Sequence, residues 1–260
     1  MATVRIATLN CRNTANKWRK RAPLLVEQLV DLAPDVIGLQ ELRHFPSQGR
    51  KIAEAVGNAT GRAHWLHPTY KTGIWWWWEG IAILSRLPIL QRDALELNGQ
   101  NKVASFARVQ LPAGGVLDVY NTHLAALGAA VRLEQMRAVL AWMSERQGPS
   151  GAAGIPQVLV GDFNASPSAE SIQLASRVLR SACAVSGGDP VRTSPTPLRR
   201  VQRSKRAAVL DYVFVSPGLE VVDAHVTFDR SHPDDPCLFA SDHFGVVADI
   251  SVLTSTMTLD

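Results

Sequence analysis

Eight polar residues with chemically useful side chains end or interrupt short apolar segments of the chain. They combine carboxylates, amides and imidazoles and include no thiol: Asn10, Glu41, His123, Asp162, Asn164, Asp211, Asp242 and His243. Oxygen ligands of this kind suit Mg²⁺ or Mn²⁺, whereas structural zinc sites use thiolates or more histidines. Each residue alone could cap a turn or satisfy a hydrogen bond in the core. Their joint pattern is what indicates a metal-dependent site.

The segments that carry these residues have the composition of buried β-strands. Continuous apolar, β-branched runs favour strands covered on both faces, and open α/β folds place their sites at strand ends. The runs are 4–10, 35–41, 117–123, 157–164, 209–216 and 241–252. Helical periodicity is found over 23–32 and 133–143, and further strand patterns over 88–97, 105–111 and 219–228. We therefore expect a layered α/β fold in one domain, residues 1–260, with a flexible basic insertion at 186–206.

Composition narrows the class of protein without defining its function. The 260 residues are 46% hydrophobic and 19% charged, which is ordinary for a globular protein. The net charge is +4, with basic clusters at 17–21 and 199–206 that are either solvated loops or sites for phosphate-bearing partners. Three widely spaced cysteines indicate reduced thiols, and Glu79 interrupts the longest apolar candidate for a membrane span. With no signal-peptide pattern, we expect a cytoplasmic monomer without a transmembrane segment.

Seven short motifs stand in an order that resembles the endonuclease/exonuclease/phosphatase superfamily, which has the deoxyribonuclease-I-like fold. They are TLN (8–10), LQE (39–41), EGIAILSR (79–86), NTHL (121–124), GDFNASP (161–167), LDYVFVS (210–216) and SDHFGV (241–246). The GDFN motif followed much later by SDH is the most specific part of the pattern. The resemblance implies a four-layer α/β sandwich, in which two stacked mixed β-sheets are flanked by helices and one active site lies at the edge.

The resemblance also implies roles for the matching residues. Glu41, with Asn10 and Asp242, would bind Mg²⁺, for which Mn²⁺ could substitute. Asp162 would orient or deprotonate the attacking water, and Asn164 would position the phosphate or the water. His243 would face the phosphate and Asp211 would orient its imidazole, a pair that stabilises charge developing on phosphoryl oxygens. Whether Asp162 or His243 is the general base stays open.

The NTHL motif resembles the branches of the superfamily that have a histidine at this position. His123 would then be a general acid or a hydrogen-bond donor to a non-bridging oxygen, and Asn121 of the same motif would contact substrate. Glu79 stands where a glutamate of the deoxyribonuclease-I-like branch hydrogen-bonds this histidine. It follows four consecutive tryptophans (75–78), which could pack in the core, meet lipid, or stack on substrate. We predict that Trp77 or Trp78 borders the substrate.

The leading hypothesis is a metal-dependent phosphoesterase that cleaves a phosphodiester. DNA or RNA is the favoured partner because the chain is basic, and Arg199, Arg200 and Arg203 are then candidate phosphate contacts. The alternative is a phosphatase or phospholipase acting on an inositol phosphate, a nucleotide or a sphingomyelin-type lipid. A non-catalytic phosphate-binding module is a further alternative, which the intact set of candidate catalytic residues disfavours.

Overall fold

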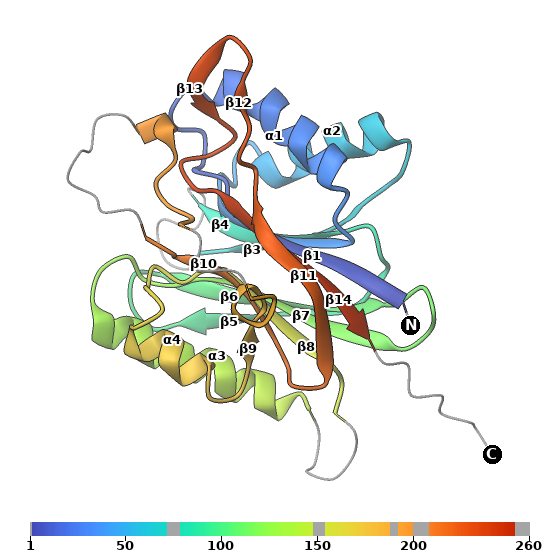
Figure 1. Ribbon diagram of the computed structural model, residues 1–260, viewed down its shortest axis with the longest axis vertical. Coiled ribbons are helices and arrows are strands. Elements are labelled where there is room, and N and C mark those ends of the chain that lie inside the picture. The colour runs from blue at the N-terminus through green and yellow to red at the C-terminus, as the bar shows by residue number, and fades with distance from the viewer. Residues whose placement is uncertain (1, 72–78, 148–153, 188–191, 200–207, 253–260) are drawn as a thin grey trace.

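Two six-stranded β-sheets stack face to face and carry helices on their outer surfaces (Figure 1). The structure is a computed structural model that describes residues 2–71, 79–147, 154–187, 192–199 and 208–252. The first sheet has the order β11 (Leu219–Thr227), β14 (Gly245–Val252), β1 (Ala2–Asn10), β2 (Val36–Leu42), β4 (Gly80–Ser85) and β3 (Trp65–Tyr70). The second has the order β5 (Ile89–Leu97), β6 (Lys102–Gln110), β7 (Val116–His123), β8 (Gln157–Asp162), β10 (Asp211–Val215) and β9 (Arg180–Ser181).

Both sheets are mixed, because one pair in each is parallel while the other pairs are antiparallel. The parallel pairs are β1–β2 and β7–β8. A short hairpin of β12 (Ser231–His232) and β13 (Asp235–Phe239) lies apart from the two sheets. The predicted four-layer α/β sandwich is therefore confirmed.

The helices complete the outer layers. They are α1 (Trp18–Leu32), α2 (Gln48–Thr60), α3 (Ala129–Glu145), α4 (Glu170–Ala175) and α5 (Ala182–Val185), with a 3₁₀ turn η2 (Pro197–Arg199). Helices α1 and α2 pack on the first sheet, and α3 and α4 pack on the second (Figure 1). The sequence pattern did not predict α2, because only Ile52 and Val56 give it a buried apolar stripe. Within the described residues, no helix has the length and apolarity required to cross a bilayer.

Strand register brings the predicted site residues to one edge of the sandwich. In the second sheet, Asp162 of β8 is paired with His123 of β7 on one side and with Asp211 of β10 on the other. In the first sheet, Asn10 at the end of β1 is paired with Gln40, the residue before Glu41. A core of apolar side chains fills the space between the sheets. The packed sheets therefore fix the strand ends relative to each other.

Candidate active site

A cavity of about 370 Å³ opens where the two sets of strand ends meet. Seven of the predicted site residues line it: Glu41, Glu79, His123, Asp162, Asn164, Asp242 and His243. Three basic residues that sequence reasoning did not select line it as well, namely Arg12, Lys71 and Lys102. The cavity thus combines carboxylates, imidazoles and cations in one confined volume, which is the arrangement expected of a catalytic site.

Glu41 enters the cavity from an irregular point in β2. The β2–β4 pairing changes register between Leu39 and Leu42, and Glu41 has a left-handed backbone with φ of +49°. Bulges and left-handed non-glycine residues cluster at functional sites because they redirect a side chain at a cost in strain. Burial and the nearby charges of Glu79, Asp242 and Asp162 raise the pKa of Glu41. The fold therefore holds a carboxylate where other carboxylates repel it.

Asn10 connects the carboxylates of the two sheets. Its fully buried amide nitrogen donates to Glu41 Oε1 at 3.1 Å and to Asp162 Oδ2 at 2.9 Å. Its amide oxygen accepts from the backbone N–H of Arg12 at 2.9 Å. Asn10 consequently sets the spacing of the carboxylates, and ligation of a cation by its oxygen would require the amide to turn.

Asp162 lies at the end of β8 and is almost fully buried. The preceding Gly161 has φ of +150°, and a Cβ added there would stand 2.0 Å from the carbonyl oxygen of Thr122, so only glycine permits this close strand contact. Asp162 Oδ1 accepts from the backbone N–H of Asn164 at 2.9 Å, while the Asn164 side chain donates to the carbonyl of Leu124 at 3.1 Å. Burial and the charge of Asp211 raise the pKa of Asp162 to about 6.

His243 and Asp211 form the predicted imidazole–carboxylate pair, with His243 Nδ1 2.9 Å from Asp211 Oδ2. Burial lowers the pKa of His243, but the charges of Asp211 and Asp162 outweigh it and raise the pKa to about 10. The imidazole is therefore a cation at neutral pH. Its Nδ1 lies 3.9 Å from Asp162 Oδ2, so the pair is next to the proposed water-activating carboxylate.

The segment 192–199 holds the loop that carries Asp242 and His243. Thr196 donates its backbone N–H to the Asp242 carbonyl at 2.9 Å and its hydroxyl to the Ser241 carbonyl at 2.6 Å. Phe244 donates its N–H to the Thr193 carbonyl at 2.7 Å. These residues belong to the segment predicted as a flexible insertion, 186–206, and its part 192–199 is thus anchored beside the cavity.

His123 is buried, but its expected hydrogen bond to Glu79 is not formed. Its Nδ1 is 3.8 Å from Glu79 Oε1, and Glu79 instead forms an ion pair with Lys71 at 2.9 Å. Among the described residues, His123 Nδ1 has no hydrogen-bond partner. Burial, followed by the charges of Lys102 and Lys71, lowers the pKa of His123 well below its ordinary value. This histidine is therefore neutral, which favours hydrogen bonding over the general-acid role among the two roles expected of it.

Lys102 is a cation of the cavity that the sequence pattern did not reveal. It stands at the start of β6 and is only 5% exposed. Burial, followed by the charge of Lys71, lowers the pKa of Lys102 to about 8. From the sequence, a lysine at the start of an apolar strand is expected to be exposed to solvent. Its burial depends on tertiary packing, which the local sequence does not show.

Asn121 does not reach the cavity, so its predicted contact with substrate is wrong. Its side chain is fully buried between the sheets, where its nitrogen donates to the carbonyls of Leu39 and Ala82 and its oxygen accepts from Gln40. These bonds join β7 to β2 and β4 and satisfy the whole amide. Trp77, Trp78, Arg200 and Arg203 lie outside the described residues, as does the side chain of Arg199.

The donor set fits a hard divalent cation. The carboxylate of Glu41 lies with Glu79 and His123 in one group whose potential ligand atoms are all within 4.8 Å of one another. Asp162, Asp211 and His243 form a second group of this kind, but there the imidazole nitrogen is already engaged by Asp211. Mutual repulsion among the carboxylates around Glu41 is relieved by a bound cation. This cluster can therefore hold a metal ion.

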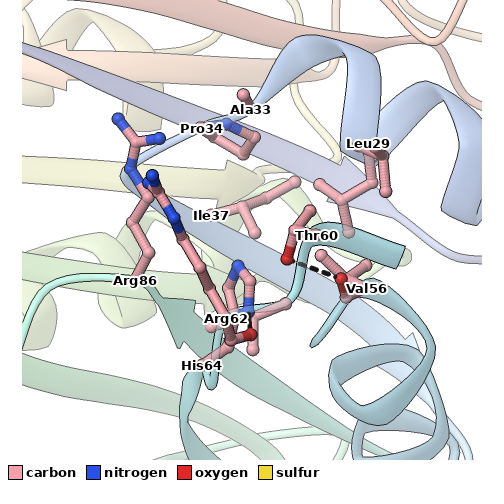
Figure 2. Close-up of a pocket in the computed structure, with 11 residues that line it drawn as sticks. Leu29, Ala33, Pro34, Ile37, Val56, Thr60, Arg62, His64 and Arg86 are labelled. Carbon is pink, nitrogen blue, oxygen red and sulfur yellow. Dashed lines mark hydrogen bonds between the residues drawn. The ribbon is translucent and has the colours of Figure 1, made fainter. Parts of the chain in front are cut away.

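A second cavity, of about 250 Å³, lies at the opposite ends of β2 and β4 (Figure 2). Apolar side chains such as Leu29, Ile37 and Val56 form its walls, and Arg62 and Arg86 run along one side. Among the described residues no carboxylate lines it. It therefore lacks the carboxylates expected of a site for a hard divalent cation, and the first cavity is the candidate active site.

The sequence profile of the Endonuclease/Exonuclease/phosphatase family matches residues 7–243. Because this match covers most of the chain, the protein belongs to that family, whose members are phosphoesterases. The site described above supplies the residues such an enzyme needs.

Individual relatives extend this comparison. Nocturnin of Drosophila melanogaster is 28% identical over 176 residues, which span 61% of this chain but only 26% of that protein. The mannosyl-6-phosphatase of Bacteroides thetaiotaomicron has a TM-score of 0.78 at 19% identity, covering 95% of this chain and 99% of the other. The human Nocturnin catalytic domain with bound sulfate has a TM-score of 0.74 at 21% identity, covering 96% and 94%. At these identities the two structures show a shared fold.

Proposed function

We propose that this protein is a divalent-metal-dependent phosphoesterase that hydrolyses a phosphodiester, with a nucleic acid as its favoured substrate. The observation that carries the proposal is the convergence of Glu41, Asp162 and the His243–Asp211 pair on one cavity. In-line phosphoryl transfer requires a positioned nucleophile and compensation of the charge on the phosphoryl oxygens, and this cavity offers groups for both.

In this proposal Glu41, from the cluster with Glu79 and His123, would hold Mg²⁺ together with Asp242, which lines the same cavity. Mn²⁺ could substitute, and the ion would supply positive charge to the phosphoryl oxygens. Asp162 orients a water molecule and accepts its proton as the water oxygen bonds to phosphorus. The opposite P–O ester bond breaks, its electron pair leaves with the alcohol oxygen, and that oxygen takes a proton from solvent. With a pKa of about 6, Asp162 is mostly ionised at pH 7 to 8 and can act as this base. His243 is protonated before the reaction begins, so it serves as a hydrogen-bonding cation for a phosphoryl oxygen.

Two further groups support the same role. Lys102 lines the cavity as a nearly buried cation, and neutral His123 lines the same cavity. We infer that both donate to non-bridging oxygens of the phosphate. Asn164, which already donates to Leu124, has a second N–H that can meet the substrate.

The preference for nucleic acid rests on the net charge of the whole chain and on the basic stretch 199–206 in its sequence. The net charge is +4, and the basic stretch 199–206 is joined to residues that border the site, since Pro195, Ala208 and Leu210 line the cavity. Lysine and arginine contacts to backbone phosphates supply much of the affinity of nucleic-acid-binding proteins. Stacking on Trp77 or Trp78 remains part of this proposal, as do contacts from Arg199, Arg200 and Arg203. A cytoplasmic monomer with one domain over residues 1–260 also remains a prediction.

A phosphomonoesterase is a second candidate, favoured by Lys71 and Lys102 in a cavity of only about 370 Å³. A phosphomonoester carries nearly two negative charges at pH 7 and needs more compensation than a diester. The shared fold with a mannosyl-6-phosphatase is compatible with this alternative.

The test is hydrolysis at pH 7 to 8 with Mg²⁺, Mn²⁺ or chelator on one panel of substrates. It holds single- and double-stranded DNA, RNA, bis-p-nitrophenyl phosphate, p-nitrophenyl phosphate, a mannose 6-phosphate, inositol phosphates and sphingomyelin. Glu41→Gln should abolish metal-dependent turnover, while Glu220→Gln, on the exposed side of β11, should not change it. Polynucleotide cleavage supports the first proposal, and cleavage of monoesters alone supports the second. Full activity of Glu41→Gln would overturn the metal assignment.

A further inference from the structure

Arg21 is a fully buried arginine in the first turns of α1, although the sequence places it in the basic cluster 17–21. Its guanidinium donates to six backbone carbonyls and, within the part of the chain that the structure describes, forms no ion pair with a carboxylate. The accepting carbonyls are those of Cys11, Arg12, Asn13, Ala15, Asn16 and Ala240, at distances of 2.7 to 3.3 Å. Such a site is selective for arginine, because only its planar fork offers five N–H donors in fixed directions.

Five of these carbonyls belong to the loop 11–16, which follows the strand end carrying Asn10. This loop is strained, since Arg12, Asn13 and Asn16 all have left-handed backbones with φ between +46° and +56°. Residues in this conformation persist only where surrounding contacts impose it. The bonds from Arg21 satisfy carbonyls that the loop geometry turns inward, so they supply that constraint.

The same loop contacts both of the residues proposed to bind the metal, Glu41 through its backbone and Asp242 through its carboxylate. Asn13 donates its backbone N–H to the carbonyl of Glu41 at 2.8 Å, and Arg12 Nε lies 3.4 Å from Asp242 Oδ2. The sixth carbonyl, that of Ala240, is two residues before Asp242 and accepts from Arg21 at 2.7 Å. One buried side chain therefore joins the loop that is bonded to Glu41 and the segment that leads to Asp242.

We propose that Arg21 is a positioning residue that fixes Glu41 and Asp242 relative to each other and so sets the affinity of the site for its divalent cation. The inference rests on the proposed function, because it assumes that these carboxylates bind the metal. The guanidinium also places a fixed positive charge behind them, which offsets their mutual repulsion before the cation arrives. Groups that orient metal ligands in this way typically change metal affinity by 10- to 100-fold when they are replaced.

The experiment is direct titration of the purified protein with Mn²⁺. Binding is monitored by calorimetry and by the electron-paramagnetic-resonance signal of free Mn²⁺. Arg21→Lys keeps the charge but offers three donors from one atom, which cannot span the six carbonyls. We expect its Mn²⁺ dissociation constant to rise by about 10- to 100-fold. Leu25→Ala is the matched control: this side chain is one turn further along α1, equally buried, and packs in the apolar core instead of the loop.

A weaker Mn²⁺ affinity in Arg21→Lys with an unchanged affinity in Leu25→Ala supports the proposal. Equal losses of Mn²⁺ affinity in both variants would mean that affinity follows the general stability of α1. No loss of affinity in Arg21→Lys would mean that the loop keeps its conformation without Arg21. Either result overturns the proposal. If Arg21→Lys does not fold, the substitution is made in a Lys17→Gly background, and the double variant is compared with Lys17→Gly alone. Glycine adopts the φ of +61° at position 17 without strain, so this background stabilises the protein. Failure of the wild type to bind Mn²⁺ or Mg²⁺ would instead refute the proposed function.

Discussion

Replacing Asp211 by asparagine should move the whole pH–activity profile to lower pH. The Asp211 carboxylate accepts from protonated His243 at 2.9 Å, and its charge is the largest of the influences that raise the pKa of that histidine. Opposite charges with centres about 4 Å apart attract by about 4 kcal/mol at an effective dielectric constant of 20. At 1.36 kcal/mol per pH unit, loss of this charge lowers the pKa of His243 by about 3, from about 10 to roughly 7.

The acidic limb should move in the same direction. Asp211 also raises the pKa of Asp162, so removing its charge allows Asp162 to ionise at a pH below about 6. The active form requires ionised Asp162 and protonated His243, and both conditions are then met at lower pH. At pH 8 only about a tenth of the variant would have protonated His243, so kcat/KM should fall at least tenfold there and less at pH 6.

The assay is kcat/KM for bis-p-nitrophenyl phosphate from pH 5 to 10.5 at saturating Mg²⁺. Asp223→Asn is the control, because Asp223 forms an exposed pair with His225 at 2.8 Å, away from the cavity. That variant should keep the wild-type profile. A profile of Asp211→Asn that is lower at every pH but keeps both limbs in place would refute the reasoning. It would show that Asp211 only supports the structure around His243.

Three further changes test separate parts of the site. Lys102→Met should raise KM and lower kcat/KM by about 10-fold or more, through loss of a charged hydrogen bond to substrate, while Mn²⁺ affinity measured by titration does not fall. His123→Ala should slow turnover by roughly 10²-fold, through loss of a hydrogen bond to a phosphoryl oxygen in the transition state, with little change in the midpoint of thermal unfolding; a structural histidine would lower that midpoint instead. Gly161→Ala should destabilise the protein by about 3 kcal/mol or more in urea unfolding, because the new Cβ meets the Thr122 carbonyl; Gly114→Ala, where the Cβ meets nothing within 4 Å, should cost about 1 kcal/mol.

The sequence was sufficient to predict the strands that carry the site residues, but not β3, β9, β12 or β13. An apolar run that stops at Asp162 or Asn10 is a local pattern, and the parallel or antiparallel pairing of neighbouring strands brings such ends together. The His243–Asp211 pair could be predicted from the motif resemblance. It could not be derived from the residues alone, because 31 residues separate the two and their contact depends on the packing of both sheets.

Asn121 shows how a correct motif can lead to a wrong role. Side chains two residues apart on a strand point to the same face, so Asn121 and His123 both point toward the other sheet. His123 is the last residue of β7 and reaches the cavity, whereas Asn121 lies deeper and meets the carbonyls of β2 and β4. The sequence gives the shared direction of the two side chains, but their depth depends on how the second sheet covers the strand.

Arg21 and Lys102 mark the limit of the sequence pattern, since a charged residue in a basic cluster or at a strand end is ordinarily solvated. Their burial costs free energy that only compensating contacts can offset. Six carbonyls provide that compensation for Arg21, and the carboxylates of the cavity do so for Lys102. Glu41 is a comparable exception, because a non-glycine residue seldom adopts the left-handed backbone conformation that Glu41 has. Natural sequences depart from such rules mainly at functional sites. Glu41 and Lys102 line one cavity, and Arg21 binds the loop that contacts it through Arg12, so these departures favour this cavity as the place where the protein does its chemistry.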